Sequence, residues 1–137
     1  MDPTIYVSSK KTHSEMWLTH KSRGYNIISS WIHYNEIFET EQVGQTLWPQ
    51  WIAEAASADY LIFWAKPGEN SHESCLLEIG ACLAAGGTIL HVGVTDTMKS
   101  GNGDLADFVY HPKWFRIPEL ETALRIASLQ TPLEPYR

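Results

Sequence analysis

Two runs of apolar residues, 58–65 and 88–94, form the strongest pattern in the sequence. Neither run alternates clearly between polar and apolar positions, which is typical of strands covered on both faces of a sheet. Between them, Leu76, Ile79 and Leu83 recur at the spacing of one helix face. A strand, a helix and a second strand of this kind predict one βαβ unit with parallel strands.

The rest of the chain alternates in the same way. A polar loop is expected from His33 to Gly44. Five strands alternating with helices predict a three-layer α/β sandwich with a parallel sheet. Besides the two runs above, β-branched and aromatic residues predict strands at 4–8, 25–32 and 113–117. Helical spacing, capping residues and first-turn prolines predict helices at 14–24, 45–57 and 118–129.

Length and charge restrict the protein class. The 137 residues fit one domain, 1–137. The net charge of −6 argues against a surface for nucleic-acid polymers or acidic membranes. No apolar run approaches the roughly 20 residues of a membrane span, and the N-terminus lacks the pattern of a secretory signal. We therefore expect a cytoplasmic protein.

Polar residues that follow the first and third predicted strands are candidates for a site. In parallel sheets of this class, ligands bind beyond the carboxyl ends of the strands, where the strand order reverses. The loop 68–74 and the start of the next helix lie at the same edge. The candidate contact residues at this edge are Tyr6, Ser8, Ser9, Trp64, His72, Glu73 and Ser74.

Glu78 is the candidate for chemistry on the central helix. At about 100° per residue it lies at the margin of the buried stripe, between small side chains. Such surroundings leave room for a ligand. An ordinary solvated helix glutamate is the alternative explanation.

The six tryptophans are the most unusual feature of the composition. Packing in the core and contacts between subunits are the ordinary explanation. The alternative is that some of them wall a pocket for a flat ring.

Three segments carry a resemblance to a known family: Ile5-Tyr6-Val7, the strand start at 58–62, and the helix Leu77-Glu78-Ile79-Gly80-Ala81 with its continuation to Gly86. Together they resemble the nucleoside 2-deoxyribosyltransferase family, including its deoxynucleoside monophosphate N-glycosidase branch. The similarity spans at least residues 4–93.

The resemblance implies a flavodoxin-like, Rossmann-like fold with a five-stranded parallel sheet. It also implies cleavage of the N-glycosidic bond of a deoxynucleoside or its 5′-monophosphate, with transfer of the sugar to another base or to water. Carried over to this chain, Glu78 is the nucleophile that attacks the anomeric carbon, and Tyr6 positions or tunes that carboxylate. Because family members complete their sites with neighbouring subunits, a homodimer or larger homo-oligomer is expected.

The base-side groups depart from the family pattern. The transferases protonate the departing base with two aspartates, and the matching positions here fall near Trp51 and at His72. Glu54, His72 and Glu73 are the available substitutes, and histidine can donate a proton near neutral pH.

Three further residues compare with the family in part. Ser71 and Ser74 lie close to the position of the serine that binds phosphate in the monophosphate hydrolases, without aligning with it. Asp59 matches a family position at the start of the third strand, where a turn or capping role is an equal alternative.

Missing motifs exclude other chemistries. The sequence has no dinucleotide or triphosphate loop, no Gly-x-Ser-x-Gly elbow and no Pro-Cys-x-x-Cys partner for a zinc deaminase site. Cys75 and Cys82 lie seven residues apart on one predicted helix, too far apart for a disulfide. We expect no metal and no cofactor.

Two functions remain open at this point. The first is an N-glycoside hydrolase or deoxyribosyltransferase that acts on a small-molecule nucleoside or nucleotide through Glu78. The second is a noncatalytic module that binds a nucleotide-derived ligand on the same fold. Retention of Glu78 and Tyr6 favours the first, and loss of the base-side aspartates favours the second.

Overall fold

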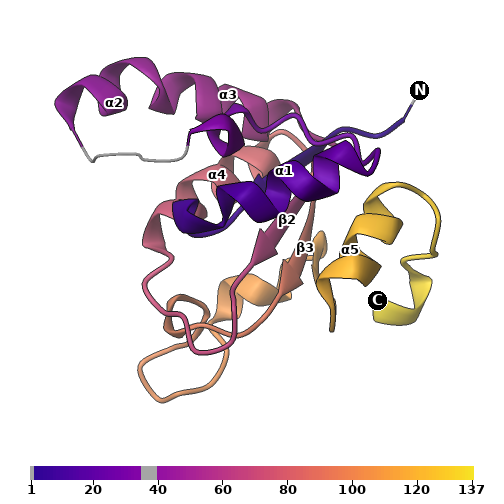
Figure 1. Cartoon of the computed structure of the whole chain (residues 1–137). Helices are drawn as coiled ribbons and strands as arrows, with labels where there is room; N and C mark the ends of the chain where they lie inside the picture. The colour runs from indigo at the N-terminus through magenta and orange to yellow at the C-terminus, as the bar shows by residue number, and fades with distance from the viewer. Residues whose placement is uncertain (1, 35–39) are drawn as a thin grey trace.

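A parallel β-sheet lies at the centre of the protein (Figure 1). The computed structural model describes residues 2–34 and 40–137. In these residues the sheet has four strands, which are β1 (Ile5–Ser8), β2 (Tyr60–Trp64), β3 (Thr88–Val92) and β4 (Trp114–Arg116). Their order is β1-β2-β3-β4, and each runs parallel to its neighbours. The predicted α/β architecture with a parallel sheet is therefore confirmed.

Helices cover both faces of the sheet. They are α1 (Ser14–Ser22), α2 (Glu41–Thr46), α3 (Trp48–Ser57), α4 (Glu73–Ala84) and α5 (Leu120–Ala127). α4 packs across β1, β2 and β3, and α3 packs against α4. α5 packs on β2 and β3 from the other side (Figure 1). Among the described residues, no helix is long and apolar enough to cross a membrane.

Short 3-10 helices complete the connections between these elements. They lie at Lys11–His13, Ser30–His33, Asp96–Met98, Asp107–Tyr110 and Glu134–Tyr136. Two of them, Lys11–His13 and Asp96–Met98, follow the carboxyl ends of β1 and β3, so they border the edge of the sheet where the candidate site is expected.

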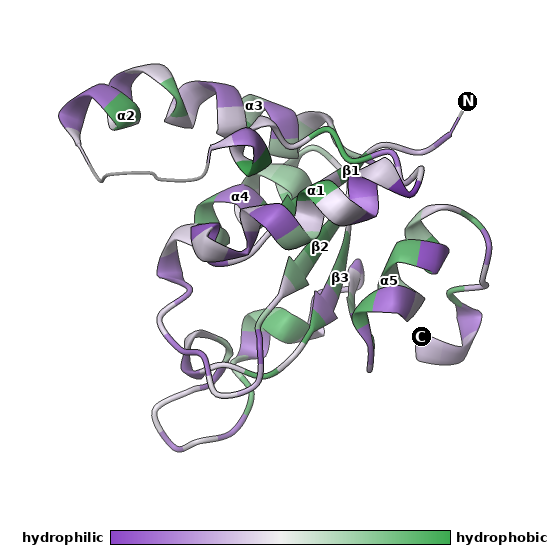
Figure 2. Cartoon of the chain, in the orientation of Figure 1, coloured by the Kyte–Doolittle hydropathy of each residue, from purple (hydrophilic) through white to green (hydrophobic). Residues whose placement is uncertain are grey.

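Strand β2, one of the two inner strands of the sheet, lies at the centre of the hydrophobic core. Leu61, Ile62 and Phe63 of β2 are fully buried, as a strand covered on both faces requires. Figure 2 shows β2 in the hydrophobic colour, between helices that carry hydrophilic residues. The register pairs Tyr6 with Leu61 and Ser8 with Phe63. Because alternate residues of a strand share a face, β1 presents Tyr6 and Ser8 together to α4.

The expected fifth strand at 25–32 is not formed, so the predicted strand count was wrong. Ile27 makes a single parallel bridge with Ile5. Further along, Ser29 Oγ accepts a 2.7 Å hydrogen bond from the Val7 N–H, and Trp31 Nε1 donates a 2.8 Å bond to the Val7 carbonyl. Side chains thus satisfy the edge of β1 where a strand would have used its backbone.

The loop expected from His33 to Gly44 is wrong at its C-terminal end. Residues 35–39 lie outside the described residues, but α2 already begins at Glu41. The Thr40 side chain caps this helix by accepting a 3.1 Å hydrogen bond from the Val43 N–H. α3 then begins at Trp48 with Pro49 in its first turn, where proline is tolerated.

Candidate functional site

Glu78 lies at the centre of the candidate site. Its position on α4 turns the carboxyl group toward β1, and the side chain has no exposed surface. The Tyr6 hydroxyl and Ser8 Oγ both donate hydrogen bonds to it, the second at 3.0 Å. Tyr6 and Ser8 are two residues apart on one strand, so the alternation of the strand alone places both donors beneath the carboxylate.

The burial of this cluster governs its protonation. Burial raises the pKa of Glu78 above its ordinary value of 4.5, against the opposing effects of the Lys11 charge and the two hydroxyl donors. Burial, and then the charge of Glu78, raise the pKa of Tyr6 far above its ordinary value. Tyr6 therefore stays protonated and acts as a hydrogen-bond donor to the carboxylate.

The buried carboxyl group predicts a pH dependence of stability that Glu78→Gln lacks. Because the pKa of Glu78 is raised in the folded state, its stabilising contribution is complete below pH 4.5 and is lost as the pH rises through the raised value. We expect the Tm of the wild type to fall relative to that of Glu78→Gln as the pH rises from 4.5 through the raised pKa of Glu78. Thermal unfolding of both proteins across that range measures the difference, and a constant difference would contradict the assignment.

Lys11 brings a positive charge to the same cluster. Its Nζ lies 4.0 Å from Glu78 Oε2. The same ammonium lies 4.3 Å from the ring centroid of Trp31, 5.0 Å from that of Trp51 and 5.4 Å from that of Trp48. Electron-rich ring faces attract a cation at these distances. The three indoles therefore hold the ammonium beside the carboxylate in a mostly buried position.

A cavity of about 500 Å³ adjoins Lys11. Its volume suits a small organic molecule. The indole N–H of Trp51, one of the lining residues, is buried and finds no acceptor in the described part of the chain. The cavity is lined by Lys11, Thr40, Val43, Gly44, Trp48, Trp51, Ser74 and Leu77.

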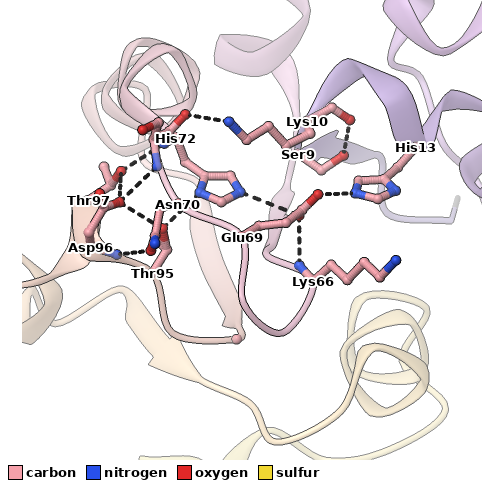
Figure 3. A network of polar contacts seen from close by, with 12 residues as sticks. Ser9, Lys10, His13, Lys66, Glu69, Asn70, His72, Thr95, Asp96 and Thr97 are labelled. Atoms are coloured by element: carbon pink, nitrogen blue, oxygen red, sulfur yellow. Dashed lines mark hydrogen bonds and ion pairs between the residues drawn. The ribbon is translucent and has the colours of Figure 1, made fainter.

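His72 belongs to a separate polar network, which Figure 3 shows. Its Nδ1 lies 2.8 Å from Thr95 Oγ1, and its Nε2 lies 3.7 Å from Glu69 Oε1. Because the Thr95 hydroxyl donates to Asp96, it accepts from the Nδ1–H of His72. Burial, and then the charge of Lys10, lower the pKa of His72 below its ordinary value. His72 is thus a neutral, buried histidine at neutral pH.

The same network ties together the loops that follow β1, β2 and β3. Glu69 Oε2 lies 2.7 Å from His13 Nε2. The Ser71 N–H donates a 2.8 Å hydrogen bond to Asp96, and Lys10 Nζ donates a 2.9 Å bond to the Ser71 carbonyl (Figure 3). The loop 68–72 is therefore anchored on both sides at the carboxyl edge of the sheet.

The structure brings only some of the predicted residues together. Tyr6, Ser8 and Glu78 form one cluster, and Ser74 lines the adjoining cavity. Glu73 is exposed in the first turn of α4 and is not a lining residue.

Three other predicted contact residues lie elsewhere. Ser9 Oγ accepts a 2.9 Å hydrogen bond from Trp17 Nε1. Trp64 packs edge-on against Trp17, with ring centroids 6.3 Å apart. Asp59 accepts a 2.8 Å bond from the Thr4 N–H beside the first residues of β1 and β2, at the end of the sheet opposite the carboxyl ends. These three side chains contact other residues of the chain, and none of them is among the residues that line the cavity beside Lys11.

Lys11 and its indole cage are what the sequence-based prediction omits. Lys11 follows the carboxyl end of β1 by three residues, so the rule that selects Ser8 and Ser9 applies to it equally. No local sequence pattern predicts the cage, because Trp31 is distant in sequence from Trp48 and Trp51. The general suggestion that tryptophans wall a pocket fits Trp48 and Trp51, which line the cavity.

Among the described residues, neither a metal-binding cluster nor a reactive thiolate lies at the candidate site. In residues 2–34 and 40–137, no group of three or more His, Cys, Asp or Glu side chains is placed to hold a metal ion. Cys75 and Cys82 are both buried, and neither forms a disulfide. Burial raises the pKa of the Cys75 thiol to about 11, so this neighbour of Glu78 is not a thiolate at neutral pH.

Comparisons with known proteins leave the function to be inferred from the site itself. No protein-family model matches the chain, and a search of curated proteins finds no match. The features that remain are a buried carboxyl group, two hydroxyl donors, a caged ammonium and a cavity walled by indoles.

Proposed function

We propose that the protein cleaves or transfers the N-glycosidic bond of a (deoxy)nucleoside or its 5′-monophosphate, with Glu78 as the nucleophile. The observation that carries the proposal is the pair of hydroxyl donors from β1 on a single carboxylate of α4, next to a cavity with two indole walls. Tyr6 and Glu78 also belong to the segments that carry the resemblance of this chain to nucleoside 2-deoxyribosyltransferases.

The fold supports the same proposal. Parallel strands in the order β1-β2-β3-β4, with helices on both faces, correspond to a flavodoxin-like sheet that lacks the strand beyond β1. In such a sheet the ligand lies beyond the carboxyl ends of the strands, close to the first one. Ser8 ends β1, and both Lys11 and the start of α4 lie beyond that edge.

The chemistry suits a carboxylate held in this way. Breaking an N-glycosidic bond passes through an oxocarbenium-like state. A fixed carboxylate below the sugar ring captures that cation as an ester, which water or a second base then opens. The hydrogen bonds from Tyr6 and Ser8 orient the Glu78 carboxylate and favour its charged form against the effect of burial.

Access to the carboxylate requires a side chain to move. Glu78 has no exposed surface, whereas Lys11 both lines the cavity and approaches the carboxylate. The lysine side chain is long and flexible, and its conformers interconvert easily. A sugar that enters from the cavity therefore displaces the Lys11 ammonium from its position beside Glu78.

A noncatalytic ligand-binding module is the second candidate. It is favoured by the absence of Glu54, His72 and Glu73, the three expected substitutes for the base-side acids, from the residues that line the cavity. In that case Trp48 and Trp51 still offer flat walls for a base.

A panel of deoxynucleosides and their 5′-monophosphates separates the two candidates. The protein is incubated with each compound, and free base is measured by chromatography. The proposal predicts release from at least one compound, and loss of that release in Glu78→Ala. Release that Glu78→Ala retains would remove Glu78 as nucleophile, and binding of a panel member without any release would favour the noncatalytic module.

A further inference from the structure

We propose that Lys11 is the catalytic residue that gives a proton to the departing base. This inference rests on the proposed function, since it assigns the acid partner of the Glu78 nucleophile. The chemical need is plain, because most nucleobases leave poorly as anions and require a proton or a strong hydrogen bond as the glycosidic bond breaks.

Glu54 and His72, two of the residues expected to protonate the base, already form other hydrogen bonds. Glu54 Oε1 accepts hydrogen bonds from the N–H of Ser30 at 3.0 Å and from its hydroxyl at 2.9 Å, and Gln50 donates to Glu54 Oε2 at 3.2 Å. His72 donates to Thr95 inside its own loop network. Neither Glu54 nor His72 lines the cavity.

Lys11 has the position that these residues lack. Among the described residues that line the cavity, it is the one with an ionisable side chain. Its ammonium lies 4.0 Å from the carboxylate that would attack the sugar. The anomeric carbon and the base nitrogen attached to it must both lie within a few ångströms of that carboxylate. Because the carboxylate attacks from the side of the anomeric carbon opposite to the departing base, Lys11 must leave Glu78 and follow the cavity that it lines to bring its N–H groups to the base.

The indole cage makes this movement of Lys11 possible while the charge is retained. Trp48 and Trp51 both line the cavity and both lie near the ammonium, at 5.4 Å and 5.0 Å from their ring centroids. As the ammonium leaves Glu78, these ring faces continue to stabilise it. The cage thus keeps a charged donor next to an apolar wall where a base can lie.

The two steps balance in protons and electrons. In the first, Glu78 Oε forms a bond to the anomeric carbon as the carbon–nitrogen bond breaks, the electron pair passes to the base nitrogen, and a proton moves from Lys11 Nζ to the base. In the second, water attacks the anomeric carbon, the ester bond breaks to restore the Glu78 carboxylate, and the water proton returns to the Lys11 amine. The net reaction is hydrolysis.

The test compares substrates that differ in their need for a proton. The first is the panel compound that releases base fastest. The second is its counterpart with a better leaving group, which is the N7-methylated base for a purine and the 5-fluorinated base for a pyrimidine. Each is given to the wild type, to Lys11→Met and to Lys11→Arg. Arginine keeps the charge but does not give up a proton at ordinary pH. The ratio of the two rates within one preparation does not depend on how much of the variant is folded.

We expect Lys11→Met to lose about 10²–10⁴-fold on the first substrate and less than about tenfold on the second. Lys11→Arg should resemble Lys11→Met. Equal losses on both substrates, or full rescue by arginine, would overturn the assignment and leave Lys11 an electrostatic or positioning residue. Equal rates of the wild type and Lys11→Met on the first substrate would overturn the role of Lys11 but leave the proposed function intact. Failure of the wild type to release base from any panel compound overturns the proposed function itself.

Discussion

Glu78→Gln is expected to lower the rate of base release by at least about 10³-fold, with the fold retained. Glutamine has nearly the same shape, and its amide oxygen can still accept from Tyr6 or Ser8. However, the neutral amide cannot capture the anomeric carbon as a stable ester, so the double displacement is lost. A nucleophile acts only through the covalent bond that it forms, which is why a near-isosteric change has so large an effect.

A matched control is available on α1. Glu15→Gln neutralises an exposed glutamate without touching the cluster around Glu78, and it should leave the rate of base release unchanged. Single-turnover rates of both variants and of the wild type make the comparison, with circular dichroism to check the fold. A Glu78→Gln protein that keeps most of its activity would contradict the assignment of Glu78 as nucleophile.

Gly93→Ala is expected to have the largest effect on stability. Gly93 has a φ of +90°, and a Cβ at this position would lie 2.3 Å from the backbone oxygen of Ala65. Both the left-handed backbone and the steric clash disfavour alanine, and the clashing atom belongs to the backbone, which cannot rotate away. We expect a loss of about 3 kcal/mol or more in the free energy of unfolding. For a chain of this size that corresponds to a fall in Tm of about 10 °C.

Gly103→Ala separates the clash from the backbone effect. Gly103 has nearly the same φ, +89°, but a Cβ there meets nothing within 4 Å. It should cost only the left-handed backbone penalty of about 1–2 kcal/mol. Denaturant unfolding of both variants gives the two free energies. Equal losses would show that the contact between the ends of β2 and β3 does not constrain this edge of the sheet.

The sequence could predict the sheet where burial alone determines the structure. The run 58–65 lacks a period of two because Leu61, Ile62 and Phe63 are buried on both faces. The segment 25–32 is also rich in β-branched and aromatic residues but does not form a strand, because Ser29 and Trp31 use their side chains to pair with Val7. A pattern of residue types cannot distinguish a backbone partner from a side-chain partner.

Only some of the site residues could be predicted from the sequence. Tyr6, Ser8 and Glu78 follow from the strand and helix periods, which fix the direction of a side chain. The position of Lys11 depends on a loop conformation and on tryptophans from separate segments, and neither has a period. The isolation of His72 depends on its bond to Thr95, a residue 23 positions away in the sequence.

The most direct test of the account is to look for the sugar on Glu78. In a nucleoside analogue with fluorine at C2 of the sugar, the fluorine destabilises the oxocarbenium-like state of both steps. If the analogue also carries a base that leaves easily, the first step is still fast enough for the ester on Glu78 to accumulate. After incubation and acid quench, proteolysis and mass spectrometry locate any added sugar. We predict one sugar unit, attached to the peptide that contains Glu78 and absent from Glu78→Gln. Release of base with the sugar on another residue, or formation of an inverted product without any adduct, would contradict the account.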